Sequence, residues 1–234
     1  SMKLSIIIPI YNEKKTIISV LDAVNSVDLG DIEKEIILVD DYSTDGSRDI
    51  LKDLESEYKV IYHKKNCGKG RALRSGFEHV TGDIIIIQDA DLEYDPNDYV
   101  SLLDPILKGK TKVVYGSRFL GKRVKLKREK YKLYYIGNQF LTFMTSVLYL
   151  RKITDMETCY KVFKREVIDE IKPNLKSQRF DFEPEITAKV IKRGYKIVEV
   201  PIWYKCRDFD EGKKITWKDG MKALWYLLKY RIVN

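Results

Sequence analysis

The sequence predicts an α/β fold built on a mostly parallel, twisted sheet with helices covering both faces. Short apolar runs alternate with segments of helical periodicity in the first half of the chain, which is the order that parallel strands joined by right-handed crossovers require. The strand expected at 83–87 is apolar on both faces, as a sheet covered on both sides demands. The 234 residues carry no repeat and no low-complexity linker, so we expect one domain spanning 2–234, with Ser1 set aside as an expression scar.

In the first half, four apolar runs predict strands at 4–9, 35–39, 59–62 and 83–87. Apolar residues at helical spacing predict helices between them, at 16–24, at 45–57 and at 69–79. Asp45 is expected to cap the second of these helices. Each strand is thus followed by a helix, apart from the last.

The second half is less regular. Strands are expected at 112–115 and 197–204, and helices at 166–171, 183–193 and 217–230. Residues 133–150 contain no charged side chain, and as a helix they would extend about 27 Å. A spanning helix needs about 20 mainly apolar residues, whereas this segment holds Gly137, Asn138 and Gln139. It is therefore predicted to be a core or interfacial helix.

Polar side chains follow each of the first four strands. These strand ends carry Tyr11-Asn12-Glu13, Asp40-Asp41, Lys65-Asn66 and Asp89-Ala90-Asp91. Because ligands of such sheets bind outside the carboxyl ends of the strands, the sequence predicts an enzyme site at this edge.

Asp89 and Asp91 are the sharpest feature of that edge. One residue separates them after a buried strand, and two clustered carboxylates repel each other unless a dication lies between them. Magnesium or manganese typically takes one or two carboxylates together with substrate phosphate oxygens. Glu93 lies close enough in sequence to add a ligand. Capping of a turn is the alternative for a bare Asp-x-Asp, but its position among acidic strand ends favours a metal.

The formal net charge of +8 suggests an anionic partner. A basic nucleic-acid-binding module does not explain the acidic strand ends, which would repel phosphates, so we expect no nucleic acid partner. The three cysteines are widely spaced, which fits a reduced compartment better than disulfides or zinc.

Four motifs together resemble family 2 glycosyltransferases, which have the Rossmann-like GT-A fold. They are Ile8-Pro9-Ile10-Tyr11-Asn12-Glu13, Val39-Asp40-Asp41-Tyr42-Ser43-Thr44-Asp45-Gly46-Ser47, Asn66-Cys67-Gly68-Lys69-Gly70 and Gln88-Asp89-Ala90-Asp91-Leu92-Glu93. The later half resembles the polyprenyl-phosphate sugar synthase branch, of which dolichol-phosphate mannose synthase is the best known. That likeness rests on Gly116-Ser117-Arg118, the segment 155–163, Phe182-Glu183-Pro184-Glu185, the segment 198–202, Arg207 and the segment 211–215. Glu93 stands where mannose synthases tend to carry Gln, and Cys159 where Gly is usual.

The resemblance implies a metal-dependent, inverting transfer of a hexose to dolichyl or undecaprenyl phosphate. The donor would be a nucleotide-sugar of the GDP-mannose or UDP-glucose type, bound by residues 2–120, and residues 121–234 would bind the acceptor. The implied donor-binding residues are Pro9, Tyr11, Glu13, Asp40, Asp41, Gly68, Lys69, Asp89 and Ala90. Mg²⁺ or Mn²⁺ would be held by Asp89, Asp91 and Glu93. The acceptor phosphate would be held by Arg118, Arg207, Lys213 and Lys214, and catalysis would fall to Asp91, Arg118 and Arg207.

Other readings of the same residues stay open. Arg118 could instead form a salt bridge to a nearby acidic residue. Within the same fold, the acceptor could be a hydroxyl of a glycan or glycolipid, with Asp155 or Glu157 as the base. Glu183 and Glu185 could contact the sugar, or could only favour a helix dipole. A catalytically dead scaffold is disfavoured by the presence of Asp89, Asp91 and Arg118.

We expect a cytoplasmic protein that is peripheral to a membrane or docks on a separate membrane subunit. The basic residues crowded at 122–132 would be attracted to anionic headgroups. The last helix carries an apolar stripe made of Trp217, Met221, Leu224, Trp225 and Leu228, which would suit a membrane surface. The alternative is that this stripe packs on the sheet.

Overall fold

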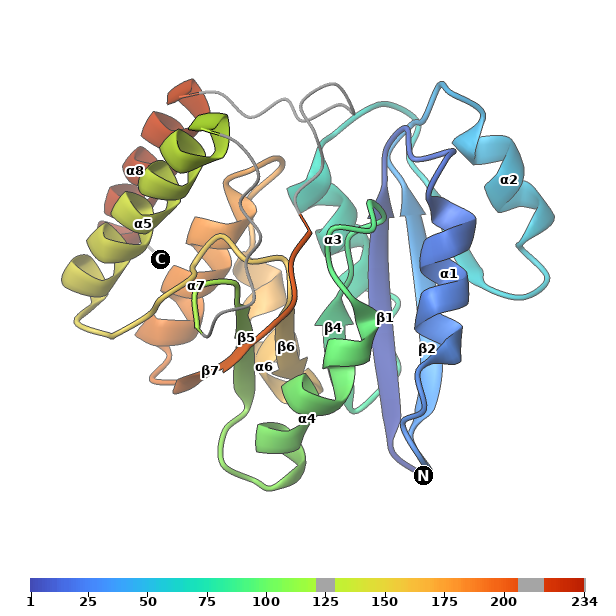
Figure 1. Ribbon diagram of the computed structural model, residues 1–234, viewed down its shortest axis with the longest axis horizontal. Helices are drawn as coiled ribbons and strands as arrows, with labels where there is room; N and C mark the ends of the chain where they lie inside the picture. The colour runs from blue at the N-terminus through green and yellow to red at the C-terminus, as the bar shows by residue number, and fades with distance from the viewer. Residues whose placement is uncertain (121–128, 206–216, 234) are drawn as a thin grey trace.

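The computed structural model describes residues 1–120, 129–205 and 217–233 (Figure 1). Within them, seven strands form one sheet in the order β3-β2-β1-β4-β6-β5-β7. The strands are β1 Lys3–Ile10, β2 Glu33–Asp40, β3 Lys59–Tyr62, β4 Ile84–Ile87, β5 Val113–Ser117, β6 Lys161–Lys164 and β7 Ile197–Pro201. Strands β3, β2, β1 and β4 are parallel to one another, and β5 is parallel to β7. The prediction of a mostly parallel sheet is confirmed.

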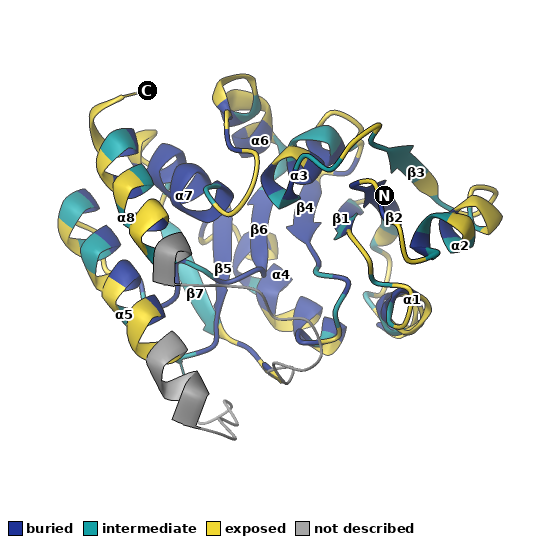
Figure 2. Cartoon of the chain, turned by 90° about the horizontal axis from the view of Figure 1, so that it is seen from above, coloured by how far each residue is buried: buried dark blue, intermediate teal, exposed yellow. Residues whose placement is uncertain are grey.

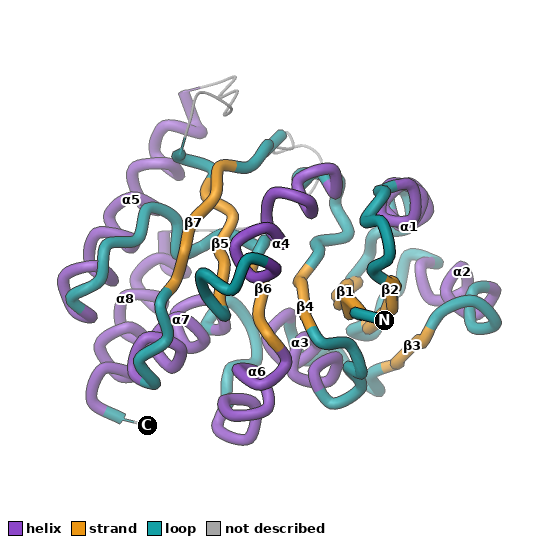
Figure 3. The backbone as a smooth tube through the Cα atoms, turned by 90° about the horizontal axis from the view of Figure 1, so that it is seen from below, coloured by secondary structure: helices purple, strands orange, loops and turns teal. Residues whose placement is uncertain are grey.

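Eight α-helices lie in the described residues. They are α1 Ile17–Ser26, α2 Ser47–Asp53, α3 Lys69–Phe77, α4 Tyr99–Leu107, α5 Glu129–Tyr149, α6 Arg165–Ile171, α7 Phe182–Lys192 and α8 Trp217–Ile232. Helices α3, α6 and α7 cover one face of the sheet, and α1 and α4 cover the other (Figures 2 and 3). Both faces are therefore covered, as the apolar strands predict.

Strand β6 is the main element that the sequence analysis missed. It pairs antiparallel with β4 on one side and with β5 on the other. Its four residues begin and end with lysine, so no apolar run in the sequence predicts this strand. The side chain of Lys161 is nevertheless fully buried. This strand brings the loop before it next to the end of β4.

One predicted helix needs correction and another helix was missed. Helix α2 ends at Asp53 rather than near Glu57. Asp45 accepts a hydrogen bond from the backbone N–H of Ser47 at 2.9 Å, but the residue at the helix start is Gly46, with φ of 96°. Helix α4 was not predicted, and it contains Pro105, a residue that normally argues against a helix interior.

The core is centred on the strands that lead to the predicted site. All four residues of β4 are 2% exposed or less. Gly76 lets α3 lie directly on β1, since a Cβ there would be 2.5 Å from Cγ2 of Ile7. This close approach fixes the position of the N-terminus of α3 at the carboxyl edge of the sheet.

Helices α5 and α8 pack together and against α7, beside the edge strand β7 (Figure 2). A second apolar cluster joins them, made of Leu141, Tyr149, Ile153, Met156, Ala188, Ile191, Ala223, Leu227 and Tyr230. The prediction that residues 133–150 form a core or interfacial helix is consistent with α5, because its Thr145 is fully buried while Phe143 is 63% exposed. None of the helices in the described residues is long and apolar enough to cross a bilayer.

Candidate active site

The polar strand ends meet at one edge of the sheet, at the top of Figure 1. After β1, the backbone N–H of Asn12 donates to Ser43 Oγ at 3.0 Å, and Asn12 Oδ1 accepts from the N–H of Thr44 at 2.8 Å. These bonds join the loops after β1 and β2. The expectation that this edge gathers polar side chains is met.

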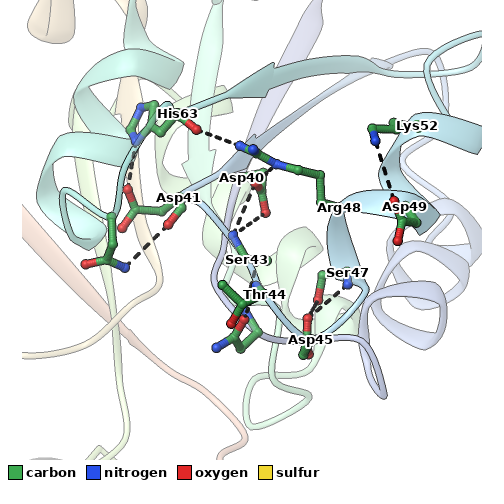
Figure 4. A network of polar contacts seen from close by, with 12 residues as sticks. Asp40, Asp41, Ser43, Thr44, Asp45, Ser47, Arg48, Asp49, Lys52 and His63 are labelled. Atoms are coloured by element: carbon green, nitrogen blue, oxygen red, sulfur yellow. Dashed lines mark hydrogen bonds and ion pairs between the residues drawn. The ribbon is translucent and has the colours of Figure 1, made fainter.

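Asp40 and Asp41, at the end of β2, point to different partners (Figure 4). Asp40 is fully buried and accepts from Arg48 Nε at 2.8 Å. The carboxylate of Asp41 contacts His63 Nδ1 at 2.7 Å and accepts from the N–H groups of Cys67 and Gly68 at 2.8 and 2.6 Å. Asp41 therefore fixes the loop that begins α3, whereas Asp40 anchors α2.

Asp41, His63 and Cys67 also bring three potential metal-ligand atoms within 4.8 Å of one another. The imidazole is already engaged on both sides, since His63 Nε2 lies 2.9 Å from Ser75 Oγ. Because Asp41 is 3% exposed and its oxygens accept backbone N–H groups, we interpret this cluster as a network that orients Asp41. His63 was not singled out from the sequence, although it is one of only two histidines and directly follows β3.

Hydrogen bonds from Gln88 and Thr16 fix the backbone of the turn after β4. Gln88 Oε1 accepts from the hydroxyls of Tyr99 and Tyr160 at 2.7 and 2.8 Å, and Gln88 Nε2 donates to the carbonyl of Asp89 at 3.0 Å. Thr16 Oγ1 donates to the carbonyl of Ala90 at 2.6 Å. The backbone of the Asp-Ala-Asp turn is thus fixed, while the side chains of Asp89 and Asp91 remain partly exposed.

Glu93 is less open than the two aspartates. It is 8% exposed, and its Oε2 accepts from the hydroxyl of Tyr204 at 3.0 Å. Its backbone N–H donates to Asp91 Oδ1 at 3.1 Å. Glu93 therefore lies beside the turn, and one of its carboxylate oxygens is hydrogen-bonded to Tyr204 in the segment after β7.

A cation already lies at the acidic turn. Lys69 Nζ, at the start of α3, is 2.8 Å from Asp89 Oδ1 and 3.5 Å from Glu183 Oε1. Burial acts to lower the pKa of Lys69, but the charges around it, including those of Asp89 and Glu183, and its hydrogen bond to Asp89 together hold that pKa well above its usual value. Burial would likewise raise the pKa of Asp89, but Lys69 keeps it below its usual value. Carboxylate oxygens are the ligands that Mg²⁺ and Mn²⁺ prefer, and Asp89 and Asp91 are both partly exposed at this turn, so the two residues fit a metal.

Arg118, after β5, lies in a buried salt bridge with Asp155. Its Nε and Nη2 donate to the two carboxylate oxygens of Asp155, each at 2.8 Å. The side chain is 4% exposed, and its guanidinium carbon lies 5.0 Å from the ring centroid of Tyr204. The salt bridge weighed for Arg118 in the sequence analysis is present, and Asp155 is its partner.

The charges of Glu183, Lys161, Arg118 and Asp155 all reach the carboxyl group of Glu157. Burial and then the charge of Glu183 raise the pKa of its carboxyl to about 8. Glu185, by contrast, is fully buried and accepts from the N–H groups of Lys176 and Ser177 at 2.8 and 2.7 Å. Glu185 thus holds a loop together, while Glu183 faces the site through Lys69.

The remaining predicted residues are placed as follows. Pro9 and Glu13 are partly exposed, and Tyr11 is 46% exposed. Gly68 is buried with φ of 96°, and a Cβ there would lie 2.6 Å from the carbonyl oxygen of Gln178. Arg207, Lys213 and Lys214 fall outside the described residues, as does the basic segment 122–128.

A sequence profile described as glycosyl transferase family 2 matches residues 5–172. The chain is 29% identical over its whole length to a dolichyl-phosphate beta-glucosyltransferase, ALG5A, of Trichomonas vaginalis, and it covers 74% of that protein. It is 30% identical to a dolichol-phosphate mannosyltransferase of Pyrococcus furiosus over 91% of this chain and 59% of that one. The chain thus spans about three quarters and about three fifths of the two relatives.

Among solved structures, the fold is similar to glucosyl-3-phosphoglycerate synthase from Mycobacterium tuberculosis in complex with Mn²⁺, UDP and phosphoglyceric acid. The TM-score is 0.74 at 19% identity, covering 100% of this chain and 80% of that one. Another structure of the same synthase holds Mg²⁺ and UDP, with a TM-score of 0.72. This likeness confirms the GT-A fold.

Proposed function

The chain belongs to glycosyl transferase family 2, and on that premise we propose that it moves a hexose from a nucleotide-sugar to a polyprenyl phosphate, with a divalent metal and inversion at the anomeric carbon. The single observation that carries the proposal is the fixed turn of Asp89 and Asp91, with Lys69 beside it at 2.8 Å. The names of the two relatives, both dolichyl-phosphate sugar transferases, support the choice of acceptor.

The diphosphate end of the donor belongs at this turn. Asp89 and Asp91 would hold Mg²⁺ or Mn²⁺, with Glu93 alongside. When bound, the metal would neutralise charge that grows on the leaving nucleoside diphosphate. Lys69 would pair with a phosphate oxygen once it leaves Asp89. Gly68 lets this loop pass close to the loop that holds Gln178, since a Cβ at Gly68 would lie 2.6 Å from the Gln178 carbonyl oxygen. Without a side chain, its backbone would also be free to approach the donor.

The nucleobase end belongs beside β1 and β2. Pro9 and Tyr11 border that side. The side chain of Tyr11 is exposed, so its ring is available to pack on a base. Asp41 is the better candidate than Asp40 for a base contact, because Asp40 is fully buried on Arg48. Glu13 would support this wall from the loop after β1.

The acceptor phosphate needs cations rather than a strong base. A phosphate monoester has a second pKa of about 6, so it is already a nucleophile at neutral pH. Arginine suits bidentate phosphate binding. Arg118 would contribute from its salt bridge with Asp155, and Arg207, Lys213 and Lys214 would complete the set.

A lipid acceptor also requires the protein to reach a membrane. The outer faces of α5 and α8 carry exposed apolar residues that we call the outer stripe: Ile136, Phe140, Phe143 and Val147 on α5, Leu150 directly after it, and Met221, Trp225, Leu228 and Ile232 on α8. Each is at least 43% exposed. Figure 2 places the two helices side by side at one end of the molecule. Exposed apolar residues gathered on two neighbouring helices suit a peripheral membrane contact.

The test is a transfer assay with matched donors and acceptors. UDP-glucose and GDP-mannose are each supplied with Mn²⁺, and the acceptors are a short-chain polyprenyl phosphate, the corresponding polyprenol and simple sugars. The expected product is a polyprenyl-phosphate hexose, formed with one donor only and lost with a chelator. Transfer to the polyprenol or to sugars, with none to the phosphate, would instead establish a hydroxyl acceptor.

A further inference from the structure

We propose that the carboxyl group of Glu157 binds hydroxyl groups of the donor's hexose and so helps to select the sugar. The inference rests on the proposed function and names a specificity-determining residue that the motifs did not assign to the donor. Three features of the structure support it. One carboxyl oxygen of Glu157 has no hydrogen-bond partner, the charged residues near Glu157 are already paired with other groups, and those residues belong to the proposed diphosphate and acceptor sites.

The first feature is the oxygen Oε1 of Glu157. It is shielded from solvent and has no hydrogen-bond partner among the residues that the structure describes. A polar atom buried in this way costs folding free energy, and an unsatisfied group in a native structure calls for an explanation. A ligand that supplies the missing hydrogen bond is such an explanation.

The second feature is that each charged neighbour already has a partner. Asp155 accepts both donors of Arg118 at 2.8 Å. Lys161 Nζ donates to the carbonyl of Met156 at 2.9 Å and also to that of Thr158. Glu183 faces Lys69 at 3.5 Å. The charges that reach Glu157 from the packed elements are thus Glu183 on α7, Lys161 on β6, and Arg118 and Asp155 from the adjoining loops.

This environment keeps Glu157 neutral near pH 7. Burial and the charge of Glu183 raise the pKa of its carboxyl to about 8, while Lys161 and Arg118 pull in the other direction. A neutral carboxyl offers one O–H donor and an acceptor oxygen. That pair suits a sugar hydroxyl, which also donates and accepts, and it avoids the repulsion that a carboxylate would exert on phosphates.

The third feature is position. The charge of Glu183 reaches Glu157, and Glu183 Oε1 lies 3.5 Å from Lys69 Nζ, beside Asp89, where the diphosphate is proposed to bind. Arg118, proposed for the acceptor phosphate, pairs with Asp155, two residues before Glu157 in the chain, and its charge also reaches Glu157. The hexose must lie between its own diphosphate and the attacking phosphate, so Glu157 lies beside the path that the sugar occupies.

The experiment compares binding of a nucleotide-sugar with binding of its own nucleoside diphosphate. Calorimetry with Mn²⁺ is run on UDP-glucose against UDP, and on GDP-mannose against GDP, for the wild type, Glu157→Ala and Glu157→Gln. Glu157→Ala is expected to weaken the nucleotide-sugar about tenfold, and the nucleoside diphosphate by less than about twofold. Glu157→Gln, which keeps a donor and an acceptor, is expected to retain most of the affinity. Glu57→Ala, at an exposed position, is the control.

A pH series adds a readout that a purely structural role would not move. Wild-type affinity for the nucleotide-sugar is expected to fall above about pH 8, as Glu157 loses its proton, and the Glu157→Gln variant is expected to lack that fall. Equal weakening of both ligands in Glu157→Ala, or no change in their ratio, overturns the inference. The proposed function fails separately, if the wild type binds no nucleoside diphosphate or transfers no sugar to polyprenyl phosphate.

Discussion

The ammonium group of Lys69 lies 2.8 Å from a carboxylate oxygen of Asp89, so the turn proposed to bind a metal already holds a cation from the chain itself. A divalent ion at Asp89 must displace this ammonium or share the carboxylate with it. A nucleotide-sugar would offer Lys69 a phosphate in exchange. Metal and donor should therefore bind together more readily than the metal binds alone.

Replacing Lys69 with Met is expected to raise the affinity for Mn²⁺ in the absence of nucleotide, by about tenfold, because the competing positive charge is gone. The measurement is the concentration of free Mn²⁺ by electron paramagnetic resonance. Lys108→Met is the control, since Lys108 pairs with Asp104 at 2.7 Å on the surface. Weaker Mn²⁺ binding in the Lys69 variant would show that the ammonium does not compete.

Replacing Asp91 with Ala is expected to abolish sugar transfer, with a loss of at least about a hundredfold, because a ligand of the diphosphate-bound metal is removed. The fold should persist, since Asp91 is partly exposed and its Oδ1 accepts a hydrogen bond from the nearby backbone N–H of Glu93 at 3.1 Å. Transfer rate and thermal melting are measured together. Full activity in this variant would contradict the proposal that transfer depends on a metal bound by Asp91.

The part of the site that depends on the parallel strands could be predicted from sequence. Polar residues after apolar runs place Asp41 and Asp89 at one edge, because parallel strands end on the same side of a sheet. The strands that precede Asp41 and Asp89, β2 and β4, both pair in parallel with β1, which lies between them.

The contacts that depend on β6 could not be predicted. The partner of Arg118 is Asp155, 37 residues away along the chain, and the two meet because β6 runs antiparallel between β4 and β5. Four residues that begin and end with lysine give too little periodicity to predict such a strand. The contact of Lys69 with Asp89 was also not foreseen, because it depends on how closely Gly76 lets α3 approach β1.

Replacing Asp155 with Ala is expected to destabilise the fold by about 3–5 kcal/mol, because the buried guanidinium of Arg118 is left without its carboxylate. Asp155 is fully buried and Arg118 is 4% exposed. The free energy of unfolding is measured in urea. Asp104→Ala breaks an ion pair whose side chains are 59% and 45% exposed, and it should cost no more than about 1 kcal/mol. Similar small losses in both variants would contradict the importance of the buried pair.

Replacing Phe143 and Trp225 together with Ser is expected to weaken binding to anionic lipid vesicles by about tenfold or more, because two large apolar side chains no longer enter the interface. They are 63% and 57% exposed, so their removal should leave the unfolding free energy nearly unchanged. Co-sedimentation at low salt measures the binding. Val100→Ser is the matched control: Val100 is also 57% exposed, but it lies on α4, which covers the sheet and is not part of the outer stripe. If the wild type and the double variant sediment equally, the outer stripe is not the membrane contact, and a separate membrane subunit would have to bring the acceptor to the enzyme.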